Sequence, residues 1–309
     1  DPFVLTQRKD IYAFAGEYFK DSLFANFAEG KSSEKELASQ DLSGIGIAIL
    51  REGKEAAAKC AMMDYGIHGD HHGHPDKLNL LVWALGLEIF PDIGRISYSV
   101  PEYETWTRTT AAHNTVAIDC KNQSPDTGKL LFFESKPGYS ASFAKSDGAY
   151  SGYELSRFLL LTDKVLVDIF KVQGSSKALI DSFLHTRGEL AHINSVEPKK
   201  IAGLGDKNGY QHLAEAREYP TAEYNAFTLA LKDGRLVRIH LPDDKEGKLY
   251  SGIGIGSQLT EKVPFILRRR EASSTVFVAC YDLSGDGSAV DSVKILPVSG
   301  KDGNALLHT

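Results

Sequence analysis

The chain has 309 residues, of which 42% are hydrophobic and 25% charged, values typical of a globular protein. This composition excludes a disordered, collagen-like or coiled-coil chain. The formal net charge of −6 does not favour nucleic acid as a partner, although a local basic pocket can still bind a polyanion. No apolar run reaches the roughly 18 residues that a membrane-spanning helix needs.

The N-terminal part of the chain has helical spacing. Apolar side chains recur there at steps of three and four residues, which places them on one face of a helix. They are Ile11, Phe14, Ala15, Tyr18, Phe19, Leu23, Phe24 and Phe27. A polar stretch over residues 30–36 follows and indicates a loop or a short helix.

From Gly44 onward the sequence consists of short apolar runs separated by turn residues. This pattern predicts antiparallel strands packed as a sandwich. The triplet 162–164 between two such runs predicts a hairpin turn. No βαβ rhythm, P-loop or GxGxxG motif supports nucleotide binding. The predicted strands are 45–50, 57–65, 78–85, 114–119, 130–134, 158–161, 165–170, 227–231, 236–241, 263–269, 275–281 and 293–296.

Four of the ten histidines fall within residues 64–78. His72 and His74 are two residues apart, so on a strand both would point to one face and could meet at one site. Asp92 and His113 follow, and two imidazoles with one carboxylate are an ordinary ligand set for zinc. The spacing alone leaves open the alternative that these histidines are structural hydrogen-bonding residues.

These histidines belong to an ordered series of motifs over about sixty residues. The series resembles the heparinase II/III-like polysaccharide lyases, a group that includes the oligoalginate lyases. The resemblance covers the middle of the chain well and the last hundred residues poorly. The matching residues are Asp64-Tyr65-Gly66, His72-Gly73-His74-Pro75-Asp76-Lys77-Leu78, Asp92-Ile93-Gly94, Tyr98, Trp106, and Ala112-His113-Asn114-Thr115.

The resemblance implies a mainly β fold, an antiparallel β-sandwich that is preceded by terminal helices of an incomplete (α/α) toroid. It assigns residues 1–40 to the toroid and 41–309 to the sandwich, with the residues after about 200 as a candidate C-terminal β subdomain. The chain begins Asp1-Pro2-Phe3 without an initiator Met. We therefore expect it to be the back part of a longer protein whose toroid is missing here.

The resemblance also implies which residues form the functional site. In such lyases a metal, usually zinc, is held by residues that correspond to His74, Asp92 and His113. The residue that corresponds to His72 lies toward the substrate cleft, where it contributes to catalysis; the alternative is a histidine that only adjoins the metal.

Three further residues are candidates for contact with the sugar, because they lie between two metal-binding segments. They are Tyr98, Trp106 and Arg108. For the two aromatic residues, a place in the sandwich core is the alternative.

The implied reaction is β-elimination on a uronic-acid polysaccharide of the alginate or heparin/heparan type, in a periplasmic or cell-surface location. The principal acid/base Tyr and its partners lie on the toroid in this family, so we expect the chain alone to bind metal but to turn over substrate poorly. Two alternatives are a non-catalytic carbohydrate-binding module with a structural metal and an unrelated metal-dependent hydrolase.

Basic residues offer two weaker signals. Arg268-Arg269-Arg270 could form a polyanion-binding patch, but alternation along a strand favours a solvated sheet edge. Lys77 could pair with Asp76 or face a polyanion, and the sequence does not decide between these.

Overall fold

In the computed structural model the chain divides into two compact units, Asp1–Ala38 and Ser39–Thr309. Within the described residues, no helix is both long enough and apolar enough to cross a membrane. The structure describes residues 9–20, 22–29, 37–54, 57–68, 72–94, 96–193, 197–220, 222–242, 247–296 and 306–308.

The first unit contains two helices, α2 (Lys9–Phe19) and α3 (Ser22–Ala28). Both lie in the segment whose spacing predicts helix, and residues 3–8 of that segment lie outside the described residues. Aromatic side chains of α2 contact each other, with the Phe14 and Tyr18 ring centroids 6.0 Å apart. The assignment of this unit to the end of a toroid stays a prediction.

The second unit begins with a five-stranded antiparallel sheet in which each strand pairs with the next along the chain. Along the third strand, β3 (Lys59–Asp64), buried and half-buried side chains alternate strictly, so one face of the sheet carries the core residues Ala61 and Met63. The second strand contacts three strands of the larger sheet, which packs against this one. The five strands are β1 (Gln40–Leu42), β2 (Ile47–Glu52), β3 (Lys59–Asp64), β4 (Asn79–Ala84) and β5 (Leu87–Phe90).

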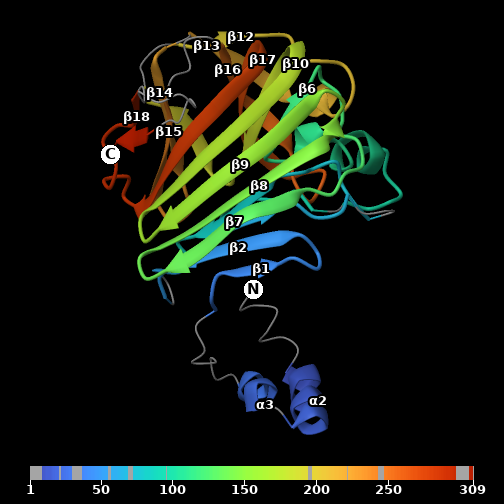
Figure 1. The fold of residues 1–309 in the computed structure, drawn as a ribbon, viewed down its shortest axis with the longest axis vertical. Coiled ribbons are helices and arrows are strands. Elements are labelled where there is room, and N and C mark those ends of the chain that lie inside the picture. Colours follow the sequence, from blue (N-terminus) through green and yellow to red (C-terminus); the bar gives the residue numbers. More distant parts are fainter. Residues whose placement is uncertain are drawn as a thin grey trace. The chain divides into compact units, whose positions relative to one another are not determined.

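The larger sheet has twelve strands, and Figure 1 shows β7, β8, β9, β10 and β17 lying side by side. A separate two-stranded sheet joins β18 (Lys294–Leu296) to β19 (Leu306–His308). The strands of the large sheet are β6 (Val116–Ile118), β7 (Lys129–Lys136), β8 (Tyr139–Tyr150), β9 (Tyr153–Thr162), β10 (Val165–His185), β11 (Glu189–His192), β12 (Lys199–Lys200), β13 (Ala214–Tyr219), β14 (Tyr224–Ala230), β15 (Leu236–Pro242), β16 (Lys248–Ile255) and β17 (Lys262–Gly285).

Two long strands, β10 and β17, bend so that the large sheet folds over on itself. Their pairing register breaks between Gln173 and Ala178. Across the break, the guanidinium of Arg268 donates to the carbonyl of Val278, ten residues away on the same strand, at 2.7 Å. A straight strand would separate these residues by roughly 33 Å. The two halves of β17 therefore face each other, and the core lies between them.

This architecture confirms the predicted mainly β, antiparallel sandwich. The hairpin at 162–164 is also confirmed, because β9 ends at Thr162 and β10 begins at Val165. The prediction that residues 263–269 and 275–281 form separate strands was wrong, because a single bent strand, β17, contains both.

The solvated edge predicted for Arg268-Arg269-Arg270 was also wrong. These residues lie on β17, which pairs with β10 on one side and β16 on the other. Arg268 is buried, and the Arg269 guanidinium bonds to the carboxylate of Asp181.

Candidate metal centre

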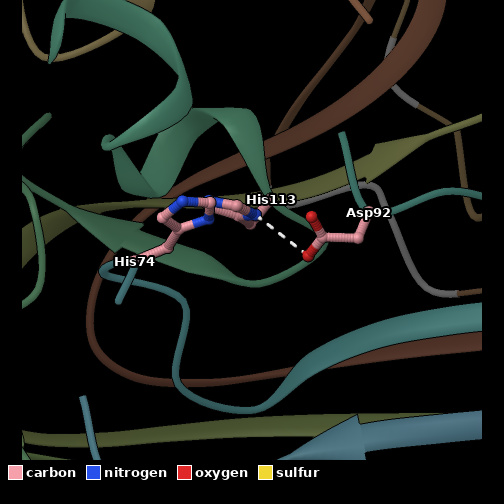
Figure 2. Close-up of side chains that lie close together, drawn as sticks. All are labelled: His74, Asp92 and His113. Atoms are coloured by element: carbon pink, nitrogen blue, oxygen red, sulfur yellow. Dashed lines mark ion pairs between the residues drawn. The ribbon is translucent and has the colours of Figure 1, made fainter. Parts of the chain in front are cut away.

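Three loop segments meet at one end of the five-stranded sheet and bring His74, Asp92 and His113 together. His74 lies in the loop between β3 and β4, and Asp92 directly follows β5. His113 follows a short 3₁₀ helix, η3 (Thr110–Ala112), and precedes β6. One potential ligand atom from each side chain lies within 4.8 Å of the others. Figure 2 shows the two imidazole rings beside each other, with the carboxylate next to His113.

His113 is fully buried, and its two ring nitrogens face different groups. Nε2 lies 3.2 Å from the carbonyl oxygen of Thr107, to which it donates a hydrogen bond. Nδ1 lies 3.5 Å from Oδ2 of Asp92 and makes no hydrogen bond to any described residue. Because a neutral imidazole that donates from Nε2 carries a lone pair on Nδ1, that lone pair points at a carboxylate.

The Asp92 carboxylate accepts hydrogen bonds from two donors. Its Oδ1 accepts from the Gly94 N–H at 2.6 Å, and its Oδ2 accepts from Nδ2 of Asn79 at 2.8 Å. Burial alone would raise the pKa of Asp92, but the His113 imidazole and the Gly94 N–H hold that pKa well below its ordinary value. The carboxylate is therefore ionised at neutral pH.

His74 supplies a neutral imidazole. Its ring centroid lies 5.1 Å from that of His113. Burial, together with repulsion from His113, lowers the pKa of His74 to about 4. Burial alone would also lower the pKa of His113, but the Asp92 carboxylate that faces its Nδ1 raises that pKa above the ordinary 6.5.

These residues fit a divalent metal ion with nitrogen and oxygen ligands. Two ligands bound to one zinc ion lie about 3.3 Å apart, close to the 3.5 Å between His113 Nδ1 and Asp92 Oδ2. A buried lone pair that faces a carboxylate needs a proton or a cation between the two groups. The set is therefore a candidate metal-binding triad.

Two asparagines fix the positions of the metal-binding segments. Asn79 begins β4, which runs antiparallel to β5, so its amide reaches Asp92 at the end of β5. Its Oδ1 accepts from the N–H of Asn114 at 2.8 Å. Nδ2 of Asn114 donates to the carbonyls of Leu80 and Pro91. The residues next to His113 and Asp92 are thus tied to each other and to β4.

His72 does not share the site of His74. Both lie in a loop instead of on a strand, so the expectation that they share a face was wrong. His72 is exposed, and its Nδ1 lies 2.7 Å from the hydroxyl of Tyr98. The Tyr98 ring in turn contacts the edge of Tyr103, with the centroids 4.6 Å apart.

Arg108 lies on the same surface, at the end of a short π-helix, η2 (Tyr103–Thr107). Its guanidinium lies 6.0 Å from the Tyr103 ring centroid, and its Nη1 lies 3.2 Å from Oε1 of Glu104. Positive charge on Arg108 also lowers the pKa of His74, whose largest shift comes from burial. We call the surface formed by His72, Tyr98 and Arg108, which packs on the buried Tyr103 ring, the His72 face.

Trp106 lies in the core, which corresponds to the alternative left open by the sequence. Its side chain is fully buried, and its indole N–H donates to the carbonyl of Ile255 at 2.8 Å. A ring without exposed surface cannot stack on a sugar, so the predicted sugar contact of Trp106 is corrected. Lys77 is also buried, and its ammonium lies 3.7 Å from Oδ1 of Asp76, so it does not face a polyanion.

The chain combines an antiparallel β-sandwich with a His–Asp–His set that could hold a metal ion. Residues 34–240 match the sequence profile of a family described as "Heparinase II/III-like, C-terminal". The chain belongs to the heparinase II/III-like family.

Curated relatives with similar sequences are polysaccharide lyases by name. The exo-oligoalginate lyase of Saccharophagus degradans is 28% identical over 279 residues, which covers 76% of this chain and 38% of that protein. The alginate lyase of Stenotrophomonas maltophilia is 29% identical over 222 residues and covers 62% and 29%. The heparin-sulfate lyase of Bacteroides stercoris is 24% identical and covers 61% and 30%. The chain thus spans less than half the length of each relative.

Solved structures show the same fold. The heparan sulfate lyase from Pedobacter heparinus superposes with a TM-score of 0.75 at 18% identity, covering 98% of this chain and 46% of that one. A heparinase III structure gives a TM-score of 0.70 at 16% identity, covering 99% and 48%.

Proposed function

We propose that this chain is the metal-bearing sandwich part of a polysaccharide lyase that cleaves uronic-acid glycans by β-elimination. The observation that carries the proposal is the pairing of an exposed, hydrogen-bonded His72 with a half-buried His74 two residues away. The His74 imidazole is available to a metal ion, and the exposed His72 imidazole faces the solvent where a glycan would bind. Alginate-type oligosaccharides are our first choice of substrate, because two of the three relatives named above are alginate lyases.

The His72 face has the chemistry that a uronate substrate requires. When the Tyr98 hydroxyl donates to Nδ1 of His72, the hydrogen of the neutral imidazole lies on Nε2, where it can donate to the substrate carboxylate. Arg108 adds a guanidinium to the same surface. The proton at C5 is weakly acidic, and donors that neutralise the adjacent carboxylate stabilise the charge that develops when a base removes it.

Zinc is the metal we propose for His74, Asp92 and His113, because two imidazoles and a carboxylate are ordinary zinc ligands. When bound, it would supply a fixed positive charge that holds the His74 loop, and with it the loop position of His72. The base and acid of the elimination are proposed to lie on a toroid domain that works together with this chain.

The test is an ultraviolet assay for the unsaturated uronate product, with oligoalginate and heparan sulfate as substrates. It uses the chain alone and the chain joined to the toroid domain of its natural protein. We expect product from the joined protein, and little or none from the chain alone. Glycan binding by the joined protein without any double-bond formation would support a carbohydrate-binding module instead, and hydrolysis without a double bond would support a hydrolase.

A further inference from the structure

Arg157 is a buried arginine that connects two segments of the candidate metal centre. It lies on β9 and is 3% exposed. Its Nη1 donates to the carbonyl oxygen of Leu78 and to that of Asn114, both at 2.6 Å. Leu78 ends the loop that carries His74, and Asn114 directly follows His113. One guanidinium nitrogen thus fixes the backbone of both histidine-bearing segments.

The rest of the guanidinium is locked by Asp168 on β10. Nε donates to Oδ1 at 2.8 Å and Nη2 donates to Oδ2 at 2.6 Å, while the hydroxyl of Tyr281 donates to Oδ2 at 3.1 Å. A bidentate pair of this kind sets the plane of the guanidinium and the direction of its remaining donors. Because the two charges compensate each other, the pair acts on the metal centre through geometry more than through net charge.

Leu78 has a backbone conformation that needs such support. Its φ is 61°, in the left-handed region that residues with a Cβ rarely adopt. Its N–H donates to the carbonyl of Asp64 at 2.6 Å, and its own carbonyl accepts from Arg157. A strained residue persists only where its surroundings hold it. Without the Arg157 bond, the end of the His74 loop is free to relax.

We propose that Arg157 is a positioning residue of the metal centre, which holds the backbone of Leu78 and Asn114 so that His74 and His113 stay at ligand distance. This inference rests on the proposed metal site. It predicts that Arg157 determines metal affinity even though it is not a ligand.

The chain contains a matched control in Arg269 and Asp181. Here Nε donates to Oδ1 and Nη2 to Oδ2, both at 2.7 Å, and the hydroxyl of Tyr210 donates to Oδ2 at 2.6 Å. Like the Arg157 pair it is a bidentate arginine–aspartate pair with a tyrosine donor, and its aspartate is buried. No hydrogen bond described for it reaches the backbone of the metal-binding segments.

The experiment compares Arg157→Lys with Arg269→Lys by zinc competition against a chelating dye. We expect Arg157→Lys to weaken zinc binding about 10–100-fold, the range typical of groups that orient metal ligands. Arg269→Lys should stay within about twofold of the original chain, because the hydrogen bonds described for Arg269 go to Asp181 and Cys120 and not to a metal-binding segment. Equal weakening in both variants would overturn the inference, since it would reflect general destabilisation.

A second readout needs no metal. The Leu80 N–H donates to the carbonyl of Asn114, so its hydrogen exchange reports the segment that Arg157 holds. In metal-free protein we expect faster exchange there in Arg157→Lys than in Arg269→Lys, and equal rates would overturn the inference. A chain that binds no zinc refutes the proposed metal site, while this comparison still decides the role of Arg157.

A variant that fails to fold is replaced by a milder one. If circular dichroism shows Arg157→Lys to be unfolded, Asp168→Asn is compared with Asp181→Asn in both measurements. Asp168→Asn keeps the arginine but loses the charge that orients it, so we expect the same direction with a smaller change in zinc affinity. No difference between these two variants would overturn the inference.

Discussion

Nδ1 of His113 lies 3.5 Å from Oδ2 of Asp92, while Nε2 of the same ring donates to the carbonyl of Thr107. The hydrogen bond at Nε2 determines which ring nitrogen carries the lone pair, and that lone pair faces the carboxylate. In the absence of metal a proton shared by the pair satisfies both groups, which explains the raised pKa of His113 despite its burial. A metal ion would take the place of that proton.

Removing one ligand should abolish metal binding and its stabilising effect together. We expect His74→Ala to weaken zinc binding by more than about 100-fold. At a zinc concentration of about 100 times Kd, binding adds about 2.7 kcal/mol to the free energy of unfolding, and the variant should lose this gain. Denaturant unfolding with and without zinc measures it. The control is His72→Ala, which should keep the zinc effect; stoichiometric zinc in His74→Ala would refute the ligand assignment.

Asn79 should affect zinc affinity because it orients the Asp92 carboxylate. Its amide donates to Oδ2 of Asp92 at 2.8 Å, so Asn79→Ala frees the carboxylate to rotate. We expect zinc affinity to fall about 10-fold or more. Asn225→Ala is the matched control, because Asn225 is equally buried and its Oδ1 accepts a hydrogen bond from Nε2 of His192 on β11. Titration calorimetry should show unchanged zinc affinity in the control, and an unchanged affinity in Asn79→Ala would contradict this role.

The sequence predicts the sandwich and the three candidate metal ligands, but it does not predict every strand or the conformations of the loops that carry the ligands. The alternating apolar runs predict the sandwich because a sheet with one buried face needs that pattern. Strand β8 escaped prediction because its sequence is rich in Ser, Ala and Gly, and its burial comes from the strands beside it. The ordered motifs identify His74, Asp92 and His113 as neighbours, but their loop conformations depend on hydrogen bonds from distant strands.

Arg157 illustrates what sequence reasoning missed and which signal was present. It is the only basic residue in the strand Tyr153–Thr162, where most neighbours are apolar. A charge in such a run predicts a buried partner, but nothing local shows that the partners are Asp168 and two backbone carbonyls. Asn79, a polar residue at the start of the apolar strand β4, carries a similar signal.

His185 should make stability depend on pH. It is fully buried, and burial together with repulsion from His113 lowers its pKa to about 3. The unfolded chain takes up a proton below about pH 6.5 while the folded chain does not until about pH 3. The free energy of unfolding should therefore fall as the pH drops from 6.5 toward 3, with His185 contributing up to about 1.4 kcal/mol per pH unit.

Urea unfolding at several pH values, with a chelator present, tests this dependence. His185→Phe removes the titrating group and keeps an aromatic ring beside Phe183 and Trp106. We expect a shallower fall in stability on acidification in this variant than in the original chain. The same slope in both proteins would show that His185 is not the group responsible.

Substitutions of Trp106 and Tyr98 should have different effects on the free energy of unfolding and on glycan affinity. Because Trp106 is fully buried, Trp106→Phe should lower the free energy of unfolding by about 1–3 kcal/mol and leave oligosaccharide affinity unchanged. Tyr98 is 49% exposed and bonds to His72, so Tyr98→Phe should weaken glycan binding with little loss of stability. Binding and unfolding measurements on the chain joined to the proposed toroid domain compare the two. The reverse pattern would place the glycan away from the His72 face.

The most direct measurement of the metal centre is anomalous X-ray diffraction at the zinc edge, from crystals grown with one equivalent of zinc. We expect one strong peak about 2.0–2.2 Å from a nitrogen of His74, an oxygen of Asp92 and Nδ1 of His113. A crystal without a peak there, or with zinc held by other residues while His113 remains paired with Asp92 alone, would contradict it.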